Sequence, residues 1–176
     1  SHNFSFSAVK TIVKKNKVFK ITGLGFYNNI DNLITLAISE GASYSYFNLD
    51  KFKTLGAQTQ VEVLIDNLKF ILSGTYTGSY NSLSENLRVD RFSYSPELRS
   101  NVTYTLKKYN LNFSAFYKYS GEVLSYYLDS DDSLKQNFMD DFHTFDLTAT
   151  KGFWKNKIKW IIGGKNLLNV KNVISR

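Results

Sequence analysis

The sequence predicts an all-β protein that forms an antiparallel transmembrane β-barrel, to which this chain contributes about eight strands. Apolar and polar side chains alternate with period two over segments of about ten residues, the length that a tilted strand needs to cross a bilayer. Short turns that contain Asn occur at residues 14–17, 66–67, 108–110 and 155–157. Long polar loops lie between them, near residues 29–46, 80–96 and 121–142. Such asymmetry is typical of a barrel whose two ends face different compartments.

Each strand is predicted from its own alternation. In the fifth segment, every second residue from Leu98 to Leu106 is apolar or small, and the residues between them are polar. In the last segment Ile161 and Ile162 are both apolar, so the facing of that strand stays open. The predicted strands are residues 3–12, 18–28, 54–66, 68–79, 97–107, 111–121, 143–153 and 157–169.

Aromatic side chains gather near the ends of these segments, as in the belts that mark the two interfaces of a membrane. The candidates are Tyr27, Tyr76, Tyr80, Tyr117 and Tyr119 near the loops, and Tyr109, Phe153 and Trp154 near the turns. A soluble β-sandwich would also alternate, but its strands are usually about half as long. Strand length therefore favours the membrane barrel and keeps the soluble β-protein as an alternative.

The net charge of +7 is unevenly distributed. Lysines concentrate at the tight turns, whereas acids gather in the loop around residues 129–141. A nucleic-acid groove would spread basic charge along a face and interleave aromatics with it. We therefore expect no nucleic-acid partner.

Little in the sequence indicates reaction chemistry. The chain has no cysteine and two histidines, His2 and His143, which are far apart in sequence. Asp129, Asp131 and Asp132 form a weak calcium candidate without EF-hand spacing, and a solvated loop explains them better. No nucleophile motif of the Gly-x-Ser-x-Gly type is present. We therefore expect that the protein is not an enzyme and that it has no cofactor and no metal site.

Binding residues are more plausible in the loops. Arginine and tyrosine together can capture an anionic chelate or stack on a planar ligand. Ordinary loop surface is the alternative for any one of them. The candidate ligand-binding residues are Tyr44, Tyr46, Arg88, Arg91 and Tyr94.

Residues 165–170, Lys-Asn-Leu-Leu-Asn-Val, resemble the end of the penultimate strand in the barrels of TonB-dependent outer-membrane receptors, with Leu168 where Phe is common. Residues 26–34 and 54–58 resemble earlier strand ends of that family, with Gln58 in place of its usual Glu. The composition, rich in Lys, Asn and Tyr, resembles members from Bacteroidetes-type bacteria.

The resemblance implies a 22-stranded barrel of the bacterial outer membrane, with short periplasmic turns and long extracellular loops. Residues 1–176 would be part of one barrel domain, its fourteenth to twenty-first strands, without the plug domain and the last strand. A small closed barrel of eight strands is the alternative.

The implied function is TonB-dependent active import of a scarce nutrient: a siderophore, haem, cobalamin or an oligosaccharide. Expected partners are outer-membrane lipid, TonB through the plug domain, and a small-molecule or oligosaccharide ligand, with a surface lipoprotein as a further candidate. A passive porin-like barrel and a soluble β-rich binding or adhesion module are the alternatives.

Overall fold

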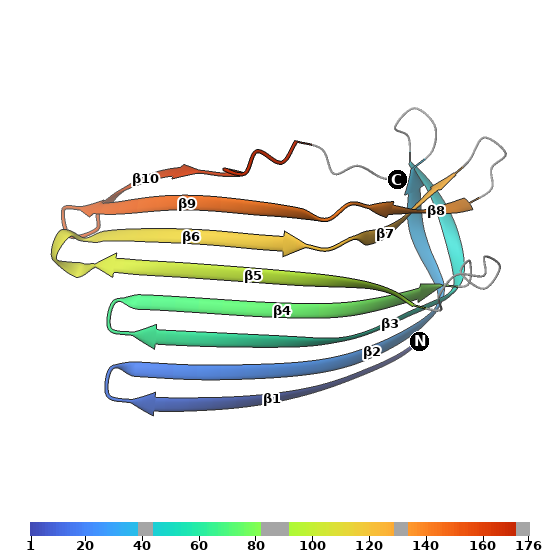
Figure 1. Ribbon diagram of the computed structural model, residues 1–176, viewed down its shortest axis with the longest axis horizontal. Helices are drawn as coiled ribbons and strands as arrows, with labels where there is room; N and C mark the ends of the chain where they lie inside the picture. The colour runs from blue at the N-terminus through green and yellow to red at the C-terminus, as the bar shows by residue number, and fades with distance from the viewer. Residues whose placement is uncertain (39–43, 82–91, 129–133, 172–176) are drawn as a thin grey trace.

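The structure, a computed structural model, describes residues 1–38, 44–81, 92–128 and 134–171 (Figure 1). This part of the chain is all-β apart from one 3-10 turn, Lys107–Tyr109. No helix in it is long and apolar enough to cross a membrane. The strands are β1 (His2–Lys14), β2 (Lys17–Ile38), β3 (Tyr44–Ile65), β4 (Leu68–Asn81), β5 (Ser93–Leu106), β6 (Leu111–Ser120), β7 (Val123–Leu128), β8 (Leu134–Met139), β9 (Phe142–Phe153) and β10 (Ile158–Gly164).

Eight of these strands form one antiparallel meander. Its order is β10-β9-β6-β5-β4-β3-β2, with β1 on the free side of β2. The hairpin β7–β8 is inserted between β6 and β9, which pair with each other. Among the described residues β1 and β10 are the two edges of the meander, and no pairing joins them. The eight predicted strands are thus confirmed as β1 to β6, β9 and β10.

The two ends of the meander differ, as Figure 1 shows. The β1–β2, β3–β4, β5–β6 and β9–β10 connections lie together at one end, called here the turn end. The N-terminus and the β7–β8 hairpin lie at the opposite end, called the loop end. At the turn end the chain reverses through residues in the left-handed region, including Lys15 (φ 51°), Asp66 (φ 50°) and Asn110 (φ 49°). Asparagine and aspartate tolerate this conformation better than most residues, which explains their place in the predicted turns.

The loop end contains more strand than the sequence predicted. The loop expected at residues 29–46 is paired over most of its length, because β2 continues to Ile38 and β3 begins at Tyr44. Asn32, with φ 56°, interrupts the pairing between Asp31 and Leu33. Beyond that point β2 and β3 bend and run toward β7 and β8 (Figure 1), where Ile38 pairs with Tyr127 in parallel. The loop expected at residues 121–142 contains the β7–β8 hairpin.

The last strand is shorter than predicted. It ends at Gly164 rather than at residue 169. Asn166 (φ 52°) and Asn169 (φ 57°) turn the chain instead. The Asn166 side chain holds this turn: its amide nitrogen donates to the Val170 carbonyl (2.9 Å) and its oxygen accepts from the Val170 amide (3.0 Å).

The strand register sorts side chains into an apolar face and a polar face. One row across the meander is almost wholly apolar, and the next row, one residue along, is mostly polar. The apolar row is Ile12, Phe19, Val63, Phe70, Val102, Ala115 and Leu147. The polar row is Thr11, Lys20, Glu62, Ile71, Asn101, Phe116 and Asp146. The sheet therefore has one face suited to lipid and the other suited to water.

The apolar face has the height of a bilayer. From Ile65 to Leu55 it covers ten residue steps of β3, which is roughly 33 Å along the strand and roughly 25 Å across a membrane at the usual tilt. Its side chains are not covered by a second layer, since Phe6 is 75% and Trp160 63% exposed. Within the described part of the chain, Tyr80 is the one large apolar side chain that is fully buried. A soluble sandwich would cover this face, so its exposure supports the membrane barrel.

Two glycines leave room for an aromatic ring of the neighbouring strand. Phe26 pairs with Gly56 and covers it, and a Cβ on Gly56 would lie 2.6 Å from the Phe26 ring and 2.7 Å from the Tyr76 carbonyl oxygen. Tyr94 covers Gly78 in the same way, with a ring atom 2.6 Å from the position of a Cβ. At both positions the absence of a side chain therefore makes room for an aromatic ring of the adjacent strand.

Candidate functional site

The polar face is the only face of this wall that suits water, so in a barrel it lines the lumen. Charged and amide side chains on this face come from most strands of the meander. They include Lys20, Gln58, Gln60, Glu62, Lys69, Glu97, Arg99, Lys118 and Asp146. Hydroxyl and amide groups link neighbouring strands between them, as where Asn28 Nδ2 donates to Thr54 Oγ1 (2.8 Å).

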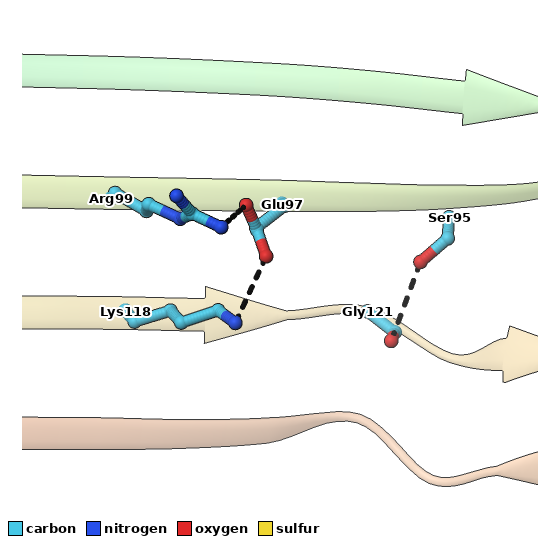
Figure 2. A network of polar contacts seen from close by, with 5 residues as sticks. All are labelled: Ser95, Glu97, Arg99, Lys118 and Gly121. Carbon is cyan, nitrogen blue, oxygen red and sulfur yellow. Dashed lines mark hydrogen bonds and ion pairs between the residues drawn. The ribbon is translucent and has the colours of Figure 1, made fainter.

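Three charged residues on β5 and β6 form a cluster toward the loop end, the Glu97 cluster (Figure 2). The Glu97 carboxylate binds Arg99 Nη2 with one oxygen (2.7 Å) and Lys118 Nζ with the other (3.0 Å). Arg99 lies directly opposite Lys118 in the register, and Glu97 shares their face because it is two residues from Arg99. One carboxylate thus separates two cations that would otherwise repel each other across the strand pair.

The Glu97 cluster has a net charge of +1 with donors to spare. Both carboxylate oxygens are engaged, whereas the guanidinium group has five N–H donors and the ammonium group three. The Arg99 side chain is 54% exposed on the wall. The arrangement can therefore bind an anionic or hydroxyl-rich group from the lumen while the carboxylate holds the cations in position.

The backbone next to the cluster marks the loop end of the wall. Ser95 Oγ donates to the Gly121 carbonyl (3.5 Å; Figure 2), and the Gly121 amide donates to the Pro96 carbonyl (2.7 Å). A Cβ on Gly121 would lie 2.5 Å from the Pro96 ring. Close contact between β5 and the end of β6 thus sets the place where the chain leaves the wall for β7.

A second ion pair lies toward the turn end of the same face. Lys69 Nζ is 3.1 Å from Glu62 Oε1, and Lys20 lies opposite Glu62 on the neighbouring strand. The lumen wall is thus charged along its length and not only near the loops.

The structure does not bring the predicted ligand-binding residues together in the part it describes. Tyr46 pairs with Leu36 in the outer part of β3 and is 78% exposed. Tyr44 is the first residue of β3, and the structure does not describe its side chain. Arg88 and Arg91 lie outside the described residues.

Tyr94 lies on the apolar face. It stacks on Tyr76 with ring centroids 5.1 Å apart, and Tyr27 lies in the same row. This placement fits the predicted aromatic belt near the loops. A ligand contact by any of the five residues stays a prediction.

Among the residues that the structure describes, no three His, Asp or Glu side chains lie close enough together to bind a metal ion. The calcium candidates Asp129, Asp131 and Asp132 lie outside the described residues. His143 lies on the apolar face, with Nδ1 2.7 Å from the Tyr117 hydroxyl and its ring 4.8 Å from that of Tyr119. It is therefore part of an aromatic group at the loop end.

Sequence reasoning missed the Glu97 cluster. Alternation alone places Arg99 on the polar side of its strand. The pairing of Arg99 with Lys118 requires the β5–β6 register, which depends on the turn at Lys107–Tyr109. A search for opposite charges two residues apart on the polar side would have found Glu97 and Arg99.

An antiparallel meander with a lipid-facing apolar side and a charged lumenal side defines the wall of an outer-membrane β-barrel. Residues 1–173 match the family described as TonB dependent receptor-like, beta-barrel, and the chain belongs to this family. No curated protein and no solved structure matches it. The expected resemblance is thus confirmed, whereas an origin in Bacteroidetes-type bacteria stays a prediction.

Membership of the family assigns the chain to the bacterial outer membrane, in a transport receptor that interacts with TonB and binds a ligand. The turn end is accordingly periplasmic and the loop end extracellular. The predicted extent of the domain and the strand total of 22 are untested.

Proposed function

We propose that this chain supplies barrel wall and outer-end lining to a TonB-dependent active importer of a scarce nutrient. The candidate cargoes are a siderophore, haem, cobalamin or an oligosaccharide. The Glu97 cluster is the observation that supports the proposal best, because it places net positive charge and free donors on the lumen wall near the extracellular end. Among the four cargoes, an anionic one such as a ferric siderophore or haem suits this charge best.

We also propose that the chain catalyses no reaction. The energy for import would come from the inner membrane through TonB, and the wall would contribute contacts rather than bond making. A surface lipoprotein partner stays a prediction.

Transport by the full-length receptor tests the proposal. Cells with and without TonB would be given each of the four cargo classes in labelled form. We expect one class to accumulate only when both the receptor and TonB are present, and the receptor in a planar bilayer to show no steady conductance. Steady conductance together with TonB-independent accumulation would instead identify a passive porin.

Arg99→Gln with Lys118→Gln should weaken binding of an anionic cargo by roughly tenfold, because two charge-assisted contacts are lost and Glu97 is left as an unpaired negative charge. The measurement is the equilibrium dissociation constant of the cargo on cells or on the purified receptor. Lys20→Gln with Lys69→Gln is the matched control, since it removes the same charge from the same wall near the periplasmic end. An equal loss in both double variants would show that the wall acts through overall charge and not through the Glu97 cluster.

A further inference from the structure

The periplasmic turns are strongly basic. The four turns, residues 14–17, 66–67, 107–110 and 154–157, contain seven lysines and one aspartate. The lysines are Lys14, Lys15, Lys17, Lys107, Lys108, Lys155 and Lys157. The described extracellular end instead carries both signs, for example Asp31 opposite Lys51. Solubility alone would not place the cations at one end.

The β1–β2 hairpin has the densest of these groups. Lys14 and Lys17 are direct partners in the register, which sets two like charges face to face. Together with Lys15, Asn16 and Asp66 they line a surface hollow of about 310 Å³. The Asp66 amide donates to the Asn16 carbonyl (3.3 Å), which ties the two turns around this hollow together. None of the three ammonium groups forms an ion pair with another residue that the structure describes.

Lys14 and Lys17 lie on the lipid side of the hairpin rather than on its lumen side. Lys14 and Lys17 continue the row of Ile65 and Leu68, at the periplasmic edge of the apolar face. Lys10 lies on the same face, four residues further into it, which is roughly 9 Å deeper at the usual tilt. A lysine at that depth can extend its stem toward the headgroups. A cation on the apolar face is favourable where an anionic headgroup meets it.

Aromatic side chains place the turns at headgroup depth. Trp154 is 75% and Tyr109 55% exposed beside the lysines of the other turns. Lys108 Nζ lies 5.6 Å from the centre of the Tyr109 ring, and Lys151 Nζ lies 5.7 Å from that of Phe153. Exposed Trp and Tyr mark the membrane interface, where lipid phosphates also lie.

We propose that the β1–β2 hairpin binds the phosphate headgroup of an anionic phospholipid in the periplasmic leaflet, through Lys14, Lys15 and Lys17, with Lys10 reaching the same group from the apolar face. The bound phosphate offsets the repulsion between Lys14 and Lys17. Phosphatidylglycerol fits better than phosphatidylethanolamine, because the ammonium group of the latter cancels the charge that the lysines recognise.

The test is lipid binding by the full-length receptor in detergent, measured by native mass spectrometry. We expect phosphatidylglycerol to bind more tightly than phosphatidylethanolamine. Lys14→Gln with Lys17→Gln should weaken phosphatidylglycerol binding by roughly 10- to 30-fold. Lys14→Arg with Lys17→Arg should retain binding, because both charges remain.

Lys20→Gln with Lys51→Gln is the control, since it removes two charges from the lumen face and the extracellular end. Comparison of boiled and unboiled samples on a gel shows that each variant is folded. Equal binding of the two lipids, no loss in the Lys14/Lys17 glutamine variant, or an equal loss in the control would overturn the proposal. Inorganic phosphate that displaces the lipid as effectively as free phosphatidylglycerol does would identify a site for free anions, and would also overturn it.

Discussion

Val61→Arg should destabilise the folded barrel by about 2–4 kcal/mol, the cost of an arginine on the lipid face near the middle of a membrane. Val61 pairs with Ile21 and Leu72 on the apolar face. It lies four residues from Ile65 and six from Leu55, near the middle of the apolar face. The guanidinium group would lose its hydration there and gain no described partner. Urea unfolding of the full-length receptor in lipid vesicles, followed by gel mobility, measures the effect.

Gln60→Arg is the matched control, because it introduces the same side chain one residue away on the polar face. Gln60 pairs with Thr22 and Ser73, which are uncharged. We expect a change below about 1 kcal/mol, since the new charge stays in the aqueous lumen. If the two variants were equally destabilised, or Gln60→Arg more so, the assignment of the lipid and lumen faces would be wrong.

Gly56→Ala should cost about 1–3 kcal/mol of stability through overpacking. The new methyl group would lie 2.6 Å from the Phe26 ring and 2.7 Å from the Tyr76 carbonyl oxygen. The ring can rotate away, but the carbonyl is part of the β3–β4 ladder and cannot move without breaking it. The same urea titration measures the loss.

Gly25→Ala provides the comparison, because a Cβ at Gly25 would meet nothing within 4 Å. We expect that variant to match the parent or to be slightly more stable. Phe26→Ala added to Gly56→Ala should relieve only part of the loss, since the contact with the Tyr76 carbonyl remains. Full recovery in this double variant would locate the strain in the ring alone.

The two faces of the wall are a local property, which is why they could be predicted. Successive side chains of a strand point to opposite sides, so the alternation from Leu98 to Lys107 already separates lipid-facing from lumen-facing residues. The tight turns were also predictable, because Asn and Asp occupy left-handed positions such as Asn110 and Asp66.

The strands at the extracellular end were less predictable, because they form through pairing with a neighbouring strand and not through an alternation of apolar and polar residues. Residues 30–38 lack a clear alternation, yet each of them except Asn32 pairs with a residue of the facing segment of β3. Residues 165–170 show the reverse case. Their apolar pattern predicted strand, but two asparagines in the left-handed region and the Asn166–Val170 hydrogen bonds make a turn.

The sequence alone therefore determines that the wall is a membrane β-sheet, which face of each long strand is apolar, and that the periplasmic turns are basic. These properties depend on residues that are adjacent in sequence. Tertiary structure decides which side chains meet. Arg99 and Lys118 are 19 positions apart, and only the β5–β6 register sets them opposite each other with Glu97 between. Lys14 and Lys17 face each other because a two-residue turn closes their hairpin. Register depends on hydrogen bonds between strands, and no residue specifies it by itself.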